Sequence, residues 1–257
     1  MERSSFDFKG YVMDIVQVRK DNWEDTQYPY NLDAVQSWDR LALHENVTFL
    51  VGENGSGKST LIEAIAIAAG FNPEGGSKNF NFSTEESHSP LSEHIRLSRA
   101  PKRNKDGYFL RAESYFNVAT QINEMDRDPY RRSPKLINAY GGTSLHQQSH
   151  GESFMSLLLH RFRGEGLYIL DEPEAALSPQ RQLAFLARMH DLVQAGSQFI
   201  IATHSPILMA YPQAWIYELQ AGGPTRVDWE NVEHVDTTRQ FLKHPESYLR
   251  ALLGDDE

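Results

Sequence analysis

Residues 52–60 read GENGSGKST, and this stretch decides the fold. It matches the pattern G-x-x-x-x-G-K-[ST] in full, and it lies between the apolar run VTFLVG at 47–52 and the segment STLIEAIAIAAG at 59–70. The run is typical of a buried strand, and the segment predicts a helix that Gly70 closes. A glycine-rich turn in this context lets consecutive backbone N–H groups point at an anion, at the positive end of the following helix. The sequence therefore predicts a phosphate-binding loop.

The side chains of this loop have the chemistry that a nucleotide requires. Lys58 is expected to reach the β- and γ-phosphates, the Ser59 hydroxyl to bind Mg²⁺, and Thr60 to add a phosphate contact. The predicted ligands are therefore ATP and Mg²⁺. A chance glycine-rich turn is the alternative, and the strand and helix on either side argue against it. The residues expected to bind the nucleotide are Gly52, Glu53, Asn54, Gly55, Ser56, Gly57, Lys58, Ser59 and Thr60.

Apolar runs and helical patterns alternate along the rest of the chain. This alternation predicts an α/β fold, with a mostly parallel sheet flanked by helices. The region 72–148 is largely polar, so we expect a lobe or lid inserted into a single domain of residues 1–257. We expect strands at 11–18, 167–170, 198–203 and 215–219, a strand followed by a turn at 108–119, helices at 153–163 and 179–194, and a short amphipathic helix at 244–253.

Two carboxylates and a histidine follow predicted strands. Asp171 and Glu172 come after the apolar run LYIL, and His204 comes after QFIIAT. Because the carboxyl ends of parallel strands meet at one edge of a sheet, we expect these side chains beside the phosphate-binding loop. Asp171 is placed to hold Mg²⁺ through water, Glu172 to polarise the water that attacks the γ-phosphate, and His204 to hydrogen-bond that phosphate. A helix cap and a structural histidine are the plainer alternatives, but the combination predicts ATP hydrolysis.

Composition restricts the class of protein. The absence of cysteine excludes disulfides, thiolate catalysis and thiolate zinc sites, and it fits a reducing cytoplasm. No stretch predicts a membrane span or a signal peptide. The formal net charge of −10 is not that of a basic nucleic-acid-binding protein. The local exception is IRLSRAPKRNK at 95–105, with five Lys or Arg and no acid; we expect a solvated loop there, with a phosphate-contacting surface as the alternative.

The motifs, taken in order, resemble those of a known superfamily. GENGSGKST, SHGES at 149–153, LYILDEPEAALS at 167–178 and ATHSP at 202–206 are similar to the Walker A, signature, Walker B with D-loop, and switch-histidine motifs of ABC-type ATPases. SHGES departs from the LSGGQ of transporters, and ATHSP is closer to the SMC, RecF and overcoming-lysogenization-defect branch. The chain is most similar to the small stand-alone ABC-type "AAA family" ATPases. The resemblance implies a P-loop NTPase fold of the ABC type, with an antiparallel β subdomain.

The resemblance also implies a head-to-tail homodimer in the ATP-bound state, in which the signature of one protomer closes on the γ-phosphate held by the other. Ser149 would offer a hydroxyl and Gly151 a close backbone approach, whereas Glu152 would have to point aside because a carboxylate repels phosphate. The alternative is that Ser149 or Ser153 simply caps a helix. Ser178 stands where transporters commonly have the D-loop aspartate, which leaves that hydrogen bond open.

Two elements of the superfamily have more than one candidate here. The Q-loop residue, which would also bind Mg²⁺, is Gln121 or Glu113. An aromatic ring that stacks on the adenine would precede the phosphate-binding loop, and simple packing is the alternative. The candidate neighbours of the adenine or the phosphates are Tyr28, Tyr30, Arg19 and Lys20.

We expect a soluble ABC-type ATPase that dimerises around two ATPs and drives a conformational switch in DNA-related processing or phage defence. Because the 257 residues contain no nuclease domain or long coiled coil, any effector is expected to be a separate protein. Nucleic acid is a further partner that the basic segment would support. The alternatives are the nucleotide-binding subunit of an ABC transporter, and a switch in which ATP closes the dimer and hydrolysis only resets it.

Overall fold

The computed structural model describes residues 7–20, 23–77, 89–111, 120, 122, 125–127, 135–142 and 149–254. Its centre is a six-stranded sheet in the order β5-β6-β7-β3-β8-β9, in which all neighbours are parallel except the last pair. The strands are β3 (Val47–Val51), β5 (Asp106–Arg111), β6 (Gly166–Asp171), β7 (Gln198–Ala202), β8 (Trp215–Gln220) and β9 (Gly223–Val227). The predicted α/β fold with a mostly parallel sheet is confirmed.

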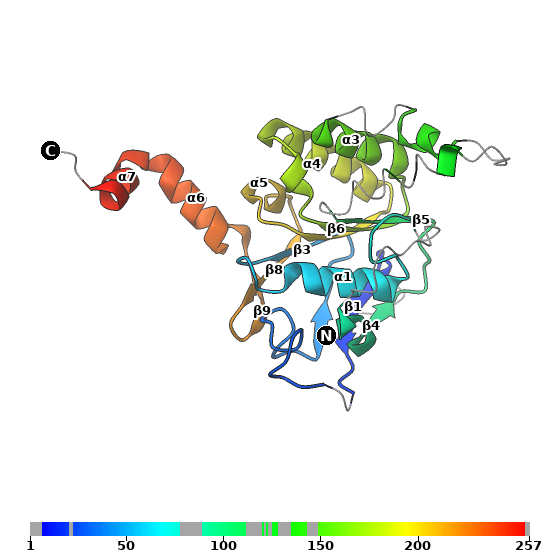
Figure 1. Cartoon of the computed structure of the whole chain (residues 1–257), viewed down its shortest axis with the longest axis horizontal. Coiled ribbons are helices and arrows are strands. Elements are labelled where there is room, and N and C mark those ends of the chain that lie inside the picture. Colours follow the sequence, from blue (N-terminus) through cyan, green and yellow to red (C-terminus); the bar gives the residue numbers. More distant parts are fainter. Residues whose placement is uncertain are drawn as a thin grey trace.

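A smaller antiparallel sheet forms a second layer, and helix α1 (Lys58–Ala69) lies between the two sheets (Figure 1). The strand order of this smaller sheet is β2-β1-β4, with β1 (Val12–Gln17) paired to β2 (Arg40–Ala42) and β4 (Ile95–Arg99). This sheet is the antiparallel β subdomain that the resemblance implied.

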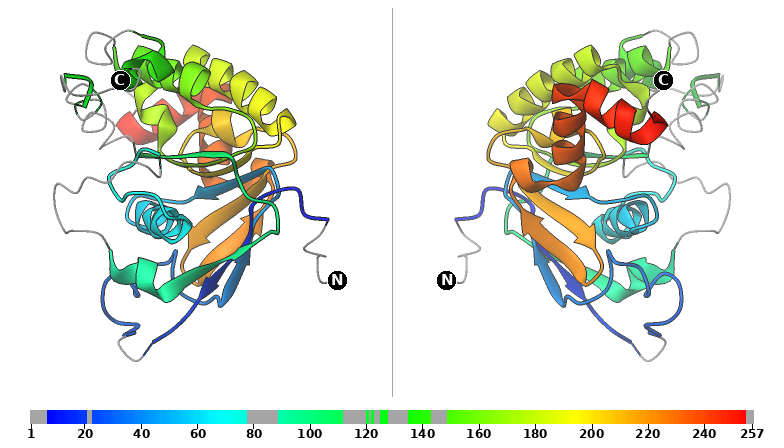
Figure 2. Two further views of the ribbon diagram at one scale, coloured as in Figure 1. Left: turned by 90° about the vertical axis from the view of Figure 1, so that its right-hand side faces the viewer. Right: turned by 90° about the vertical axis from the view of Figure 1, so that its left-hand side faces the viewer.

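The other face of the central sheet is covered by α3 (His150–Ser156), α4 (Pro179–Gln194) and α5 (Pro206–Met209) (Figures 1 and 2). Helices α6 (Glu233–Lys243) and α7 (Pro245–Leu253) extend from the body as an arm (Figure 1). A π-helical turn, Leu157–Arg161, continues α3. Short 3₁₀ turns lie at Pro90–His94, Leu136–Tyr140, Pro173–Ala176 and Trp229–Asn231.

The central strands are mostly apolar because both faces of the sheet are buried. In β7, Phe199 and Ile201 pack toward α3 and α4, whereas Ile200 and Ala202 pack toward α1. Each such side chain contributes about 1.5–3 kcal/mol relative to an exposed one. The fully buried Gln198 joins the two sheets: its amide accepts from the N–H groups of Tyr11 and Val12 and donates to two backbone carbonyls.

The boundaries of several elements differ from the sequence prediction. Within 72–148, strand β4 belongs to the antiparallel sheet and β5 to the central sheet, so this region is not a separate lobe along its whole length. The first half of the basic segment, Ile95–Arg99, is strand rather than loop. The helix expected at 153–163 begins at His150, and β2, β9 and α6 were not expected at all. In the described ranges, no helix has the length and apolarity that crossing a membrane requires.

Candidate nucleotide-binding site

The loop between β3 and α1 has the backbone of a phosphate cradle. Gly57 has a φ of 95°, and a Cβ there would lie 3.0 Å from the side chains of Leu32 and Ala34, so only glycine fits. Ser56 is 6% exposed, and its hydroxyl has no hydrogen-bond partner within the part of the chain that the structure describes. Buried hydroxyl groups are normally hydrogen-bonded. An orphaned hydroxyl in a glycine-rich turn ahead of a helix fits a loop that binds phosphate.

Lys58 directs its ammonium into this loop. Its Nζ lies 3.0 Å from the carbonyl oxygen of Gly52 and 2.8 Å from that of Glu53, and the side chain is buried. Burial lowers the pKa of Lys58, and the nearby carboxylates of Glu172, Asp171 and Glu174 oppose that shift. The ammonium is therefore held by carbonyl dipoles at the place where phosphate oxygens would bind it more strongly.

Ser59 and Asp171 meet at the carboxyl edge of the sheet. The Ser59 hydroxyl donates to Oδ1 of Asp171 over 3.2 Å. Hydroxyl and carboxylate oxygens are the ligands that Mg²⁺ prefers, and this ion usually takes only one or two of them from the protein. Among the described residues, no group of three or more His, Cys, Asp or Glu could hold a metal ion. Gln121, the third predicted Mg²⁺ ligand, and its alternative Glu113 lie outside the described residues.

Glu172 and His204 lie together beside these groups. Glu172 has a left-handed backbone, with φ 49°, and its Oε1 lies 3.4 Å from Nε2 of His204. The backbone N–H of His204 donates to Oε1 of Glu174 over 2.5 Å. Burial, followed by the charge of Lys58, lowers the pKa of His204, which favours the neutral imidazole. Burial also raises the pKa of Glu174.

Sequence reasoning missed two side chains at this edge, Arg111 and His234. Arg111, at the end of β5, is paired in register with Asp171; its Nη1 lies 2.6 Å from Glu63 and its Nε 3.9 Å from Asp171. His234, on the first turn of α6, has its Nε2 3.5 Å from Nδ1 of His204. The only sequence signal for Arg111 is its place at the end of an apolar run, and His234 has none.

The signature segment forms a capped helix start. The Ser149 hydroxyl accepts from the backbone N–H of Glu152 over 3.3 Å, and Oε2 of Glu152 accepts from the N–H of Ser149 over 2.9 Å. This reciprocal pair is a capping box. The other Glu152 oxygen lies 3.5 Å from Arg181. The helix cap, which was the alternative interpretation of Ser149, is therefore present in the single chain. Ser178 caps α4 by accepting from the N–H of Arg181.

The four candidate neighbours of the adenine or the phosphates differ in their exposure and in their contacts. Tyr28 is 63% exposed, and its hydroxyl lies 3.3 Å from Oγ1 of Thr60, at the loop. Tyr30 is buried and packs against Trp23, with ring centroids 4.4 Å apart. Arg19 lies over the Trp23 ring, and Lys20 lies 3.9 Å from Glu93. Of these four residues, only Tyr28 has a contact with the loop.

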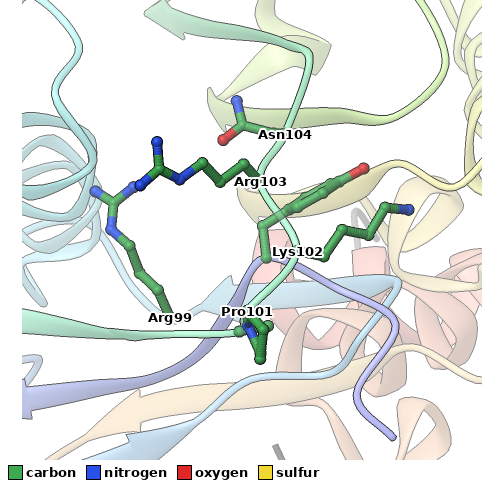
Figure 3. Close-up of a pocket in the computed structure, with 7 residues that line it drawn as sticks. Arg99, Pro101, Lys102, Arg103 and Asn104 are labelled. Atoms are coloured by element: carbon green, nitrogen blue, oxygen red, sulfur yellow. The ribbon is translucent and has the colours of Figure 1, made fainter. Parts of the chain in front are cut away.

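The basic segment lines a surface pocket of about 550 Å³ (Figure 3). Arg99 donates to the carbonyl of Ala68, near the end of α1 opposite to the loop. Lys102 and Lys105 lie 3.9 and 2.5 Å from the carboxylate of Glu165. Three of the five cations in the basic segment, residues 95–105, therefore have partners within the chain. The pocket is lined by Tyr11, Arg99, Ala100, Pro101, Lys102, Arg103 and Asn104.

Comparison with known proteins gives two matching family models. One, described as "AAA domain, putative AbiEii toxin, Type IV TA system", matches residues 138–210, and the other, described as "AAA domain", matches residues 31–158. Together they cover the loop, the signature segment, Asp171, Glu172 and His204. No curated protein matches the chain.

Solved structures of ATP-binding cassettes are similar in fold. "An inward-facing conformation of a putative metal-chelate type ABC transporter" is 15% identical, with a TM-score of 0.50, over 87% of this chain and 86% of that one. An ATP-binding cassette of an ABC transporter in its ADP conformation is 16% identical, with a TM-score of 0.47, over 93% of this chain and 98% of that one. At this identity, the similarity concerns the fold alone.

Proposed function

We propose that the chain, whose residues 31–158 and 138–210 match family models of AAA domains, binds Mg·ATP in the loop of residues 52–60 and hydrolyses it with Glu172. The observation that carries the proposal is the convergence of Lys58, Asp171, Glu172 and His204 at one edge of the sheet. These groups come from three neighbouring strand ends, β3, β6 and β7.

Each side chain has a separate task in this reaction. Lys58 exchanges its two carbonyl partners for phosphate oxygens and neutralises their charge. Bound Mg²⁺, held by Ser59 and, through water, by Asp171, would offset the charge that develops between the β- and γ-phosphates. Glu172 accepts a proton from the attacking water, and the neutral His204 donates a hydrogen bond to the γ-phosphate.

We further propose that the active form is a homodimer in which Ser149 and Gly151 of one protomer complete the ATP site of the other. In the single chain, Ser149 lies at the exposed start of α3, where the positive end of the helix faces solvent. One oxygen of Glu152 accepts from the N–H of Ser149 and the other lies 3.5 Å from Arg181, whose positive charge offsets part of the repulsion between this carboxylate and phosphate.

The test is the solution mass of Glu172→Gln with and without Mg·ATP. Slow hydrolysis should trap a dimer, because the carboxylate that activates water is gone. Ser149→Asp and Ser149→Asn in the same background separate capping from ATP contact. Both residues are good N-caps and should leave the melting temperature unchanged, but only the aspartate places a negative charge against the γ-phosphate.

We expect Ser149→Asp to abolish the dimer and Ser149→Asn to retain it. If both variants dimerise as well as Glu172→Gln alone, the interface lies elsewhere. If Glu172→Gln binds ATP and stays monomeric, the homodimer proposal is wrong.

The proposed pathway is a switch with a separate effector in DNA-related processing or phage defence. The description of one matching family as a component of a toxin–antitoxin system supports a partner, because such systems have two components. We expect affinity-tagged Glu172→Gln with Mg·ATP to retain an effector that Lys58→Met does not retain. The alternative, a transporter subunit, predicts that the retained protein is an integral membrane protein.

A further inference from the structure

The imidazole of His204 lies between the carboxylate of Glu172 and the imidazole of His234. His204 faces Glu172 with Nε2, at 3.4 Å from Oε1, and faces His234 with Nδ1, at 3.5 Å from Nε2. The two rings are 5.2 Å apart between centroids and meet edge to face at 70°. Nε2 of His204 and Nδ1 of His234 are both buried, and neither has a partner in hydrogen-bond geometry among the residues that the structure describes, so the 3.4 Å approach of Glu172 is a charge contact.

The position of His234 is fixed by the residues around it. Val232 and Val235 on either side are buried in the core. The N–H of Glu233 donates to Oε1 of Glu218 in β8 over 3.2 Å. The indole of Trp229 donates to the carbonyl of Pro206 over 3.1 Å. The first turn of α6 is therefore anchored to the body, although most of the later residues of α6 and α7 are exposed.

For neutral His204, only one distribution of protons makes both of its contacts attractive. With its proton on Nε2, neutral His204 directs an N–H toward the Glu172 carboxylate, and its bare Nδ1 accepts from Nε2–H of His234. In the reverse arrangement, a nitrogen lone pair of His204 would face the carboxylate. The proton of His234 would then sit on the buried Nδ1, which has no acceptor.

We propose that His234 is a positioning residue: it donates Nε2–H to Nδ1 of His204 and so holds the His204 ring with its own Nε2–H toward Glu172 and the γ-phosphate. The hydrogen bond that one ring nitrogen makes determines which nitrogen of the partner carries the proton. This inference rests on the proposed hydrolysis by Glu172. The two distances are those of the nucleotide-free chain, and such contacts shorten when substrate binds.

The first measurement is ¹⁵N NMR of the histidine rings in the wild-type chain, with His204 and His234 assigned from the spectra of His204→Gln and His234→Gln. We expect a proton on Nε2 of both residues and a bare, hydrogen-bonded Nδ1 in His204. A proton on Nδ1 of His204 would overturn the proposal. This readout does not depend on ATPase activity.

The second measurement is the ATPase kinetics of three variants at position 234. Gln places an amide N–H where Nε2 lies, whereas Asn is too short and Leu has no donor. We expect Leu and Asn to lower kcat about fivefold to tenfold at unchanged KM, as the loss of one hydrogen bond predicts, and Gln to restore it. Equal kcat in all three variants, with melting temperatures unchanged, would refute the positioning role.

A double-mutant cycle shows whether His234 acts through His204. In a His204→Ala background, His234→Leu should cause no further loss, because the ring that it orients is absent. An additional loss of the same size would mean that His234 acts elsewhere. The matched control is His190→Leu, which removes a histidine on α4 that contacts the hydroxyl of Tyr211 and should leave kcat unchanged. If the wild-type chain does not hydrolyse ATP, the proposed function fails while the NMR test still decides the hydrogen bond.

Discussion

The hydroxyl of Ser59 lies 3.2 Å from a carboxylate oxygen of Asp171, although 112 residues separate them in the chain. The contact exists because β6 lies two places from β3 in a parallel sheet, so the strand end at Asp171 reaches the start of α1. The hydroxyl and the carboxylate held together in this way place two oxygen atoms where Mg²⁺ would bind.

Replacing Asp171 with Asn should therefore weaken the binding of Mg·ATP without weakening the binding of ATP in the absence of Mg²⁺. Asn can still accept from Ser59, but it has no charge to hold a metal-bound water. We expect a loss of about 10–100-fold in the Mg²⁺-dependent part of the affinity, the usual cost of removing such a partner. Calorimetric titration with Mg²⁺ and with EDTA measures it, with the exposed Asp228→Asn as the control. Equal losses in both buffers would contradict a role in metal binding.

Lys58→Met should remove the response to nucleotide and leave the chain folded. Methionine fills the buried site with a side chain of similar length but cannot bind phosphate. At about 100 times the dissociation constant, ATP should raise the melting temperature of the wild type by about 5–10 °C, and that of the variant not at all. The exposed Lys20→Met is the control and should keep the full shift. A shifted melting curve for Lys58→Met would mean that ATP binds elsewhere.

Tyr28 should contribute to the affinity for ATP by contacting the adenine base and not the phosphates. Tyr28→Ser removes the exposed ring beside Thr60 and should weaken ATP about 5–100-fold, the range that the stacking of one base provides. Tyr28→Phe keeps the ring and should bind almost as the wild type does. Inorganic triphosphate, which has no base, should bind Tyr28→Ser and the wild type equally. Equal weakening of ATP and triphosphate would assign Tyr28 to the loop instead.

Glu174→Gln should stabilise the chain at neutral pH and not in acid. Because burial raises the pKa of Glu174, the stability that this carboxyl contributes is present below its unfolded pKa and is lost as the pH rises through the raised value. Gln cannot ionise, yet its oxygen can still accept from the N–H of His204.

The measurement is the melting temperature of Glu174→Gln and wild type between pH 4 and pH 8. The difference should grow with pH, by about 2–4 °C for each kcal/mol gained in a chain of this size. Glu246→Gln on the exposed α7 should show no such trend. A constant difference across this range would mean that Glu174 titrates normally.

The elements that sequence predicted best are those whose pattern is local. Helix α4 was expected at 179–194 and has those bounds, and β6 and β7 lie within one residue of their predicted ends. Continuous apolar runs mark a doubly buried strand, and a Ser-Pro start marks a helix. The loop at 52–60 was recognisable for the same reason, since its glycines, lysine and hydroxyls are consecutive.

The elements that sequence missed depend on contacts across the fold. Strand β2 has three residues, too few for any periodicity, and β9 contains a proline and pairs only at the sheet edge. His234 lies 30 residues from His204, in a polar helix whose one buried residue is Val235. Its relation to the site arises only when β8 pairs with β3 and returns the chain to the sheet.

The close approach of Gly151 to the turn after Glu172 bears on how two sites would communicate. A Cβ at Gly151 would lie 2.7 Å from the carbonyl oxygen of Ala176, and Arg181 of α4 lies 3.5 Å from Glu152. The start of α3 is thus in direct contact with the backbone that follows Glu172. In a homodimer, occupancy of one ATP site would be transmitted to the hydrolytic carboxylate of the other, and turnover would be cooperative, with a Hill coefficient above one.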